Sequence, residues 1–225
     1  MPRRPRIWMP EGIYHITLRG NNRQAIFLDA TDFHRYLLEL RRARNELPHR
    51  VVAFALMPNH VHLVLEASTH ASLSDVMQQV NVGYTRYFNH RYHRVGQLYQ
   101  GRFYSNFVDR DAYLLEVTRY VHLNPVRACL AQHPADYPWS SFRLYVGFER
   151  DPSDLIDAGR VLQLFGASPK ERMEQYRQFV EGFALEEQDA WVQRLADSKL
   201  IPPSHWLAPQ QVPGTSQIGK CLAPV

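Results

Sequence analysis

Two histidines, His60 and His62, stand two positions apart just after a Pro58-Asn59 turn. Side chains alternate across a β-strand, so both imidazoles would lie on one face and the apolar residues between them on the other. Imidazole is the commonest protein ligand for divalent metals. The spacing therefore predicts a two-ligand half-site, although such a pair by itself is a weak signal.

A second chemically competent segment contains Tyr120 and Asn124. Residues four apart share one face of a helix, so the phenol and the amide would lie one turn from each other, with Glu116 a further turn back. The Asn124 amide oxygen could complete a metal site begun by His60 and His62. Tyr120 would then sit one turn from the metal.

This combination of residues suits phosphodiester chemistry. A phenol has a reference pKa of about 10 and is a poor nucleophile at neutral pH. A divalent metal on the scissile phosphate offsets this by drawing charge from phosphorus and holding the phosphate in line. Attack by Tyr120 would give a covalent phosphotyrosine, which conserves the phosphodiester energy for rejoining the strand. The alternative for Tyr120 is ordinary packing, because the chain has 12 tyrosines.

The elements that would position these residues follow from hydrophobic periodicity. We predict strands over residues 12–19, 51–57, 60–66 and 102–108, and helices over residues 29–47, 72–88 and 110–124. Pro125 should end the last helix, because the residue before proline avoids helical geometry. The order indicates a ferredoxin-like α+β fold, an antiparallel sheet with helices on one face and the other face free.

The chain divides by pattern into three parts. Residues 1–148 are expected to form the domain that carries the candidate site, and residues 149–200 a C-terminal helical extension. Within the extension we predict helices over 155–165 and 169–183 and a further amphipathic stretch around Trp191 and Leu195. Residues 201–225 are rich in Pro, Gln, Gly and Ser, which is typical of a flexible tail.

Composition excludes some classes of protein. The chain has 225 residues, 45% hydrophobic and 21% charged, which is ordinary for a globular protein. No apolar run approaches the length that spans a bilayer, and the basic N-terminus has no apolar segment behind it, so we predict no signal peptide. Cys129 and Cys221 lack metal or redox spacing. These features favour a cytoplasmic protein.

A net charge of +4 allows a nucleic-acid partner without demanding one. The basic arm suits a groove or the phosphates of a hairpin stem, the Gly-Asn-Asn loop suits extruded bases, and aromatic and basic residues further on suit a single-strand channel. Solvated surface charge explains each cluster about equally well. The predicted DNA-binding residues are Arg3, Arg4, Arg6, Arg19, Asn21, Asn22, Arg23, Tyr99 and Arg102.

Five stretches in order resemble the HUH superfamily of single-strand nucleases, and more closely its REP-associated tyrosine transposases, a branch of the one-tyrosine single-strand transposases. They are Gly12 to Asn21, Met57 to Leu65, Gln100 to Phe103, Arg119 to Ala128 and Tyr137 to Phe142. Each motif is modest alone, but the ordered set is specific. The resemblance implies the HUH nuclease fold.

The resemblance also implies a function. It makes Tyr120 the nucleophile and His60, His62 and Asn124 the metal ligands. It implies an endonuclease and strand transferase that acts with Mg²⁺ or Mn²⁺ on single-stranded DNA at REP-type palindromic hairpins, through a 5′-phosphotyrosine, in DNA transposition and recombination. A monomer is favoured over a homodimer, because the C-terminal helices could cover the dimer face.

Two other functions stay open at this point. A sequence-specific hairpin-binding regulator would keep the fold and bind DNA without a covalent adduct. A metal-dependent phosphodiesterase with water as its nucleophile would still cleave DNA when Tyr120 is replaced by phenylalanine.

Overall fold

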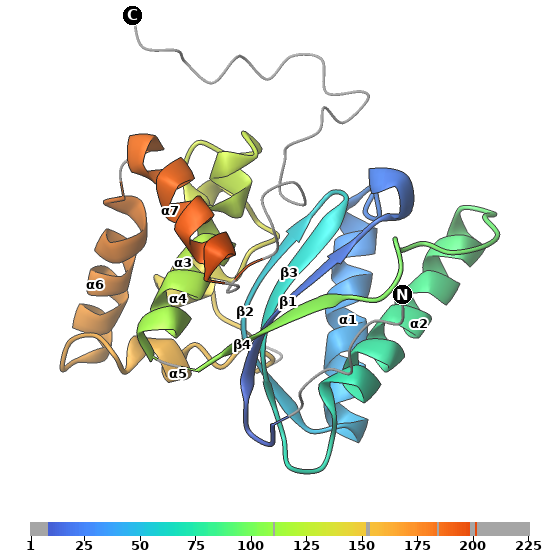
Figure 1. Cartoon of the computed structure of the whole chain (residues 1–225), viewed down its shortest axis with the longest axis horizontal. Helices are drawn as coiled ribbons and strands as arrows, with labels where there is room; N and C mark the ends of the chain where they lie inside the picture. The colour runs from blue at the N-terminus through green and yellow to red at the C-terminus, as the bar shows by residue number, and fades with distance from the viewer. Residues whose placement is uncertain (1–8, 110, 152–153, 184, 199–200, 202–225) are drawn as a thin grey trace, which may run out of the picture.

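The computed structural model describes residues 9–109, 111–151, 154–183, 185–198 and 201. Its centre is one antiparallel sheet in the order β2-β3-β1-β4 (Figure 1). The strands are β1 (Ile13–Arg19), β2 (His49–Met57), β3 (His60–Ala67) and β4 (Tyr104–Val108). The order and the pairing match the predicted ferredoxin-like α+β fold, which is confirmed.

Two long helices cover one face of this sheet. They are α1 (Ala30–Glu46), whose N-terminus is capped by the Asp29 side chain, and α2 (Leu73–Arg91), capped by Ser72. A cap of this kind satisfies amide groups that have no partner inside the helix. The apolar strand residues that face these helices form a continuous core with them. The alternation predicted for β3 therefore holds.

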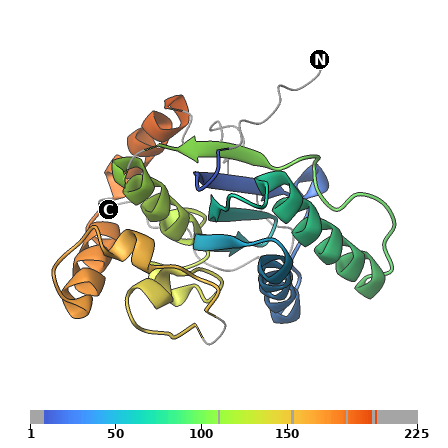
Figure 2. The ribbon, with the colours of Figure 1, turned by 90° about the horizontal axis from the view of Figure 1, so that it is seen from below.

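The opposite face is covered as well, so the prediction of helices on one face only needs correction. Helix α3 (Asp111–Arg127) lies across β2 and β3 on that side, and Figure 2 shows the sheet between α1 and α2 on one side and α3 with the C-terminal helices on the other. The physical reason is that this face is also apolar away from the histidines. Val52, Ala55 and Val64 point into a second core there.

Helix α3 runs about one turn beyond its predicted end, so that Pro125 lies inside it. Proline removes one backbone donor, but two later amides continue the turn: Ala128 donates to the Asn124 carbonyl and Leu130 to the Pro125 carbonyl. Burial of Asn124 and Pro125 holds the segment against the sheet. Tertiary packing thus overrides the local tendency to stop.

The remaining elements are short. They are η1 (Asn21–Arg23), η2 (Pro134–Asp136), α4 (Phe142–Tyr145), α5 (Gly159–Leu162), α6 (Pro169–Glu181) and α7 (Leu185–Asp197). Helix α5 is shorter than predicted, whereas α6 and α7 lie where the pattern placed them. Ile201, at the start of the predicted tail, is buried in the second core, and residues 202–225 lie outside the described residues. Among the described helices, none is long and apolar enough to cross a membrane.

Candidate active site

Strand β3 places His60 and His62 together on the face that α3 covers. Their ring centroids are 4.9 Å apart, and the His62 side chain is fully buried. The shared face was predicted from the spacing, but the imidazoles were expected to face outward. His62 is covered and His60 is half-buried, because α3 docks over this part of the sheet.

Hydrogen bonds orient the two rings. His60 Nδ1 lies 2.6 Å from Asn59 Oδ1, and His62 Nδ1 lies 3.1 Å from His15 Nε2. If Nδ1 is the protonated nitrogen in each ring, Nε2 carries the lone pair that can bind a metal. His62 Nε2 is buried and has no hydrogen-bond partner among the described residues. An unsatisfied imidazole nitrogen of this kind fits a metal ligand.

Burial keeps both imidazoles neutral. It lowers the pKa of His60 to about 3, assisted by the positive charge of Arg19, and it lowers the pKa of His62 well below the usual value, assisted by His60 and His15. A neutral imidazole is the form that binds metal. The pair is thus ready to bind a cation at neutral pH without first losing a proton.

Tyr120 comes to the same place from α3. Its ring centroid lies 5.4 Å from that of His62 and 5.7 Å from that of His15, and its side chain is 1% exposed. No described residue hydrogen-bonds to its hydroxyl. Burial raises the pKa of Tyr120, and Arg127 and Asn124 partly offset this effect. The hydroxyl is therefore a weakly acidic group beside the histidines.

Asn124 lies one turn along α3 and is buried. Its Nδ2 donates to the Tyr120 carbonyl at 2.7 Å, which leaves its Oδ1 as the donor atom for a cation. The described residues contain no group of three His, Cys, Asp or Glu side chains placed to hold a metal. The predicted third ligand, Asn124, is not one of these four residue types.

His15 is a site residue that the sequence prediction missed. It lies on β1 beside β3, opposite Val64, and its imidazole stacks on His62 with centroids 5.4 Å apart. The sequence contains part of the information, because the alternation of side chains along a strand places His15 and Thr17 on one face. Only the pairing of β1 with β3 brings that face beside His62.

Helix α7 supplies a second unpredicted neighbour. The Trp191 ring lies 6.1 Å from that of Tyr120, and its Nε1 donates to Glu116 at 2.5 Å. Arg119 also binds Glu116, and its guanidinium lies 4.9 Å from the Trp191 ring. Glu116 therefore anchors α7 to α3.

The predicted DNA-binding residues are dispersed. Arg3, Arg4 and Arg6 lie outside the described residues. Arg19 ends β1 opposite His60 and is buried, so it is not an exposed loop residue. Asn21, Asn22 and Arg23 form η1, where Asn22 and Arg23 are exposed.

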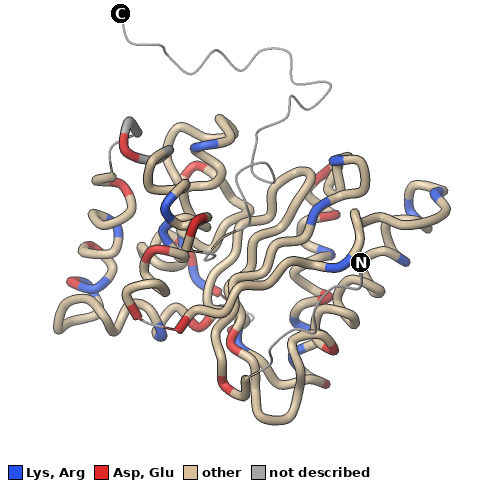
Figure 3. Tube along the Cα trace, in the orientation of Figure 1, with Lys and Arg blue, Asp and Glu red and all other residues tan. Residues whose placement is uncertain are grey.

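The last two predicted residues, Tyr99 and Arg102, belong to the loop before β4. Tyr99 is buried on the α2 side of the sheet, so its ring is no surface stacking platform, whereas Arg102 is exposed. Figure 3 shows basic residues along α1 and α2 and on the loops at one end of the sheet, with acidic residues interspersed. In this view the basic residues do not form one uninterrupted group.

Comparison with known proteins adds independent findings. A protein from Haemophilus influenzae that is named as a REP-associated tyrosine transposase is 26% identical to this chain over 157 residues. These residues cover 64% of this chain and 86% of that protein. The solved structure of a REP-associated tyrosine transposase bound to a REP hairpin has a TM-score of 0.58 and 19% identity, covering 68% of this chain and 90% of that chain. At this identity the structural match supports the fold.

The family model described as "Transposase IS200 like" matches residues 9–124, from just before β1 to Asn124 on α3. The match spans all four strands and includes His60, His62 and Tyr120. It agrees with the resemblance to the one-tyrosine transposases drawn from the ordered motifs. The chain belongs to the IS200-like transposase family.

Proposed function

We propose that this transposase cleaves and rejoins single-stranded DNA at REP-type hairpins through a 5′-phosphotyrosine on Tyr120. His60, His62 and Asn124 are the proposed ligands of Mg²⁺ or Mn²⁺. The observation that carries the proposal is the convergence of Tyr120, whose hydroxyl has no described partner, on His62, whose Nε2 is likewise unpaired. The two rings that carry these groups are in edge-to-face contact.

In the proposed reaction, Tyr120 Oη forms a bond to the scissile phosphorus and the bond from phosphorus to the 3′ oxygen breaks. The phenol loses its proton, and the 3′ oxygen leaves as a hydroxyl after gaining one. Rejoining is the reverse attack by a 3′ hydroxyl on the phosphotyrosine. A divalent cation supplies the positive charge that stabilises the phosphate and favours the phenolate. Arg127 acts in the same direction, because it lowers the pKa of Tyr120.

The proposal requires the site to open. Tyr120 is 1% exposed, and Trp191 of α7 lies against it. A phosphate can reach the hydroxyl only if this cover moves when DNA binds. We propose that α7 is the part that moves, because its Trp191 covers Tyr120, whereas the sheet is held by strand pairing on both sides of β1 and β3.

The hairpin substrate is supported by the relatives. The matched structure is of a protein bound to a REP hairpin, and the curated relative carries the name of the same group. We extend this substrate class to the present chain, together with a monomeric state and a cytoplasmic location. The 1–148 domain, with residues 149–200 as its helical extension, is the proposed functional unit.

The test is incubation with a labelled single-stranded hairpin library and Mn²⁺, followed by a denaturing gel and peptide mapping. A covalent adduct on Tyr120 is expected. Tyr120→Phe should reduce adduct and cleavage by roughly a thousandfold while hairpin binding survives, because only the nucleophilic oxygen is lost. His62→Ala or removal of the metal by a chelator should also abolish cleavage.

Tyr137→Phe is the matched control, because Tyr137 is another buried tyrosine and its hydroxyl donates to the Leu56 carbonyl instead. It should retain adduct formation. DNA cleavage that survives Tyr120→Phe would replace the proposal with a water-dependent phosphodiesterase. Tight hairpin binding without any cleavage by the unmodified chain would replace it with a hairpin-binding regulator.

A further inference from the structure

The turn that begins β3 is held by backbone hydrogen bonds from both sides of η1. Gly20 N, just before η1, donates to the Asn59 carbonyl at 2.8 Å. The amides of Ile26 and Phe27, just after η1, donate to the Pro58 carbonyl at 2.8 and 3.1 Å. The chain on each side of η1 is thus tied to the turn that leads into the histidine strand.

The Asn59 side chain links this turn to η1 and to β3. Its Nδ2 donates to the Arg23 carbonyl at 3.2 Å, and its Oδ1 lies 2.6 Å from His60 Nδ1. A carbonyl oxygen can only accept a hydrogen bond, so the Arg23 carbonyl requires the amide nitrogen of Asn59 on its side. The amide oxygen of Asn59 therefore faces His60.

The direction of this second hydrogen bond fixes the tautomer of His60. The amide oxygen can only accept, so His60 Nδ1 must carry the proton. A neutral imidazole has one ring N–H, which leaves the lone pair on Nε2. Histidines that bind a metal through one nitrogen usually donate the other to a second residue in this way. The ring nitrogen that is open to a cation is thus set by a carbonyl on η1.

An unusual backbone conformation presents the Arg23 carbonyl. Arg23 has a φ of 61° and Asn22 a φ of 47°, both in the left-handed region. Asparagine tolerates this region, whereas for arginine it is uncommon. Both side chains are exposed, so burial of a side chain does not account for the strain. Strained backbone of this kind persists where the surrounding structure holds it, and it is concentrated at functional sites.

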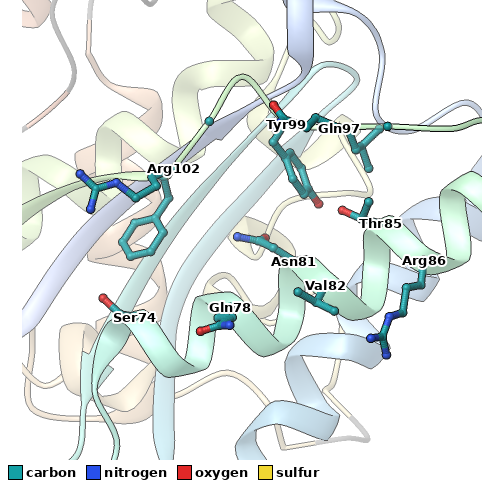
Figure 4. A pocket seen from close by; sticks show the side chains of 13 residues that line it. Ser74, Gln78, Asn81, Val82, Thr85, Arg86, Gln97, Tyr99 and Arg102 are labelled. Atoms are coloured by element: carbon teal, nitrogen blue, oxygen red, sulfur yellow. The ribbon is translucent and has the colours of Figure 1, made fainter. Parts of the chain in front are cut away.

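The first residue of η1 is held by the loop that precedes β4. Asn21 N donates to the Leu98 carbonyl of this loop at 2.8 Å. The loop and α2 border a cavity of about 720 Å³, and Figure 4 shows the Tyr99 ring pointing from the loop toward α2. Backbone pairing therefore restrains Asn21, which leaves Asn22 and Arg23 as the part of η1 that can change conformation.

We propose that Asn59 is a positioning residue that transmits the conformation of η1 to the metal-binding nitrogen of His60. The inference rests on the proposed function, which makes His60 a metal ligand. Displacement of the Arg23 carbonyl would free the Asn59 amide to turn over and present its nitrogen to His60. Nδ1 would then accept the hydrogen bond, the ring proton would reside on Nε2, and Nε2 could no longer bind a cation.

This arrangement couples η1 to the metal site. A ligand that holds η1 in its present conformation would favour the metal-binding tautomer, and a bound cation would favour that conformation of η1. The two effects are equal in size, because the coupling free energy between two sites is reciprocal. Asn21, Asn22 and Arg23 are predicted DNA contacts, so DNA and metal would strengthen each other's binding.

The tautomer is measured first, in the metal-free protein. The full chain is labelled with ¹⁵N-histidine, and its ring nitrogens are observed at neutral pH in two-bond ¹H–¹⁵N correlation spectra. The His60 signals are assigned by their loss in His60→Gln. The unmodified chain should carry the proton on Nδ1 of His60. A proton on Nε2 would overturn the proposal, whether or not any variant folds.

Two substitutions at Arg23 separate its backbone from its side chain. Arg23→Gly and Arg23→Val remove the same charge, but glycine adopts a positive φ freely and a β-branched residue does not. Arg23→Gly should keep the Nδ1 proton on His60. It should change the dissociation constant for Mn²⁺, measured from the electron paramagnetic resonance of the free ion, by less than about twofold. Arg23→Val should show both tautomers and weaken Mn²⁺ binding about fivefold.

Substitutions of Asn59 test the side chain itself. Asn59→Leu removes both hydrogen bonds and should weaken Mn²⁺ binding about tenfold or more. Asn59→Asp is the rescue variant, because either carboxylate oxygen accepts from His60 Nδ1. It should keep the tautomer and bind Mn²⁺ no more than about threefold more weakly than the unmodified chain. Asn89→Leu is the matched control, because Asn89 also donates to a loop carbonyl, that of Gly96, at 3.0 Å. It should change neither measurement.

The results distinguish this coupling from the proposed cleavage, because neither measurement involves DNA. The coupling would be overturned if Asn59→Leu kept both the Nδ1 proton and the Mn²⁺ affinity, or if the two Arg23 variants behaved alike. Absence of Mn²⁺ binding by the unmodified chain would overturn the coupling together with the proposed metal site. The expected tautomers and affinities without a Tyr120 adduct would support the coupling and remove only the proposed strand transfer.

Discussion

The buried histidines are unusual at the scale of single residues, because three of them are kept neutral by their surroundings. Besides His60 and His62, His122 on α3 is fully buried, and burial lowers its pKa to about 3. Its Nδ1 lies 2.6 Å from the Tyr176 hydroxyl and its Nε2 lies 2.8 Å from Ser141 Oγ. His122 does not reach the candidate site in any described contact, so its role is to join α3, α4 and α6.

These pKa values predict how stability depends on pH. An unfolded histidine has a pKa near 6.5 and folded His122 one near 3, so between these values only the unfolded chain binds the proton. The stabilisation is complete above pH 6.5 and is lost as the pH falls toward 3. For each histidine of this kind, the free energy of unfolding should fall by about 1.4 kcal/mol for every pH unit by which the pH is lowered within this window.

His122→Gln tests this, since glutamine keeps polar atoms for Tyr176 and Ser141 but has no titrating group. The free energy of unfolding is measured with urea at several pH values between 7 and 4.5, roughly the range in which the unfolded histidine gains its proton. The slope of this free energy against pH should be smaller in the variant, by the amount that corresponds to about one proton. The absolute stability of the variant does not matter for the comparison. An identical slope in both proteins would mean that folded His122 titrates normally.

At the scale of elements, α3 is held between the sheet and α7. The Arg119 guanidinium lies 4.3 Å from the Phe179 ring and 4.2 Å from the Phe183 ring, and Trp191 completes the cluster. Cation–π contacts of this kind are strongest where water is excluded. The same helix therefore presents Tyr120 to the sheet and Arg119 to the C-terminal helices.

Trp191→Ala should consequently lower the free energy of unfolding by about 3 kcal/mol, because it removes a buried indole together with its hydrogen bond to Glu116. The measurement is urea denaturation. Gln193→Ala, on the same helix but exposed, is the matched control and should change stability by less than about 0.5 kcal/mol. Equal stability of the two variants would show that α7 is not docked as described.

At the scale of the whole molecule, the C-terminal extension shares a core with the sheet. Val161 of α5, Tyr176 of α6 and Val192 of α7 are buried in one cluster with Val52 of β2 and Val117 of α3. The division at residue 148 stays a prediction about function and sequence pattern. In packing terms, the described extension completes the second face of the sheet.

This shared core predicts one cooperative unfolding transition for the full chain. Circular dichroism of the helices and fluorescence of the four tryptophans should report the same urea midpoint, because neither side of the core is stable without the other. A chain that ends at residue 148 should expose the apolar face of α3 and aggregate. Two separate transitions would instead establish the extension as an independent unit.

Much of this protein is determined by local sequence. Alternation alone determined that His60 and His62 share a strand face, and helical spacing determined that Tyr120 and Asn124 share a turn. The strand and helix order determined the sheet topology, because few arrangements satisfy short connections and antiparallel pairing. The ordered motifs determined the family.

Tertiary structure decided the rest, because contacts between distant elements depend on register and docking that no local pattern encodes. The pairing of β1 with β3 brought His15 to His62, and the docking of α7 buried Tyr120 beside Trp191. Packing of α3 on the sheet carried the helix through Pro125 and covered the face that was expected to be free. The cavity between α2 and the loop before β4 arises in the same way, from segments whose spacing in the sequence gives no sign that they enclose a space.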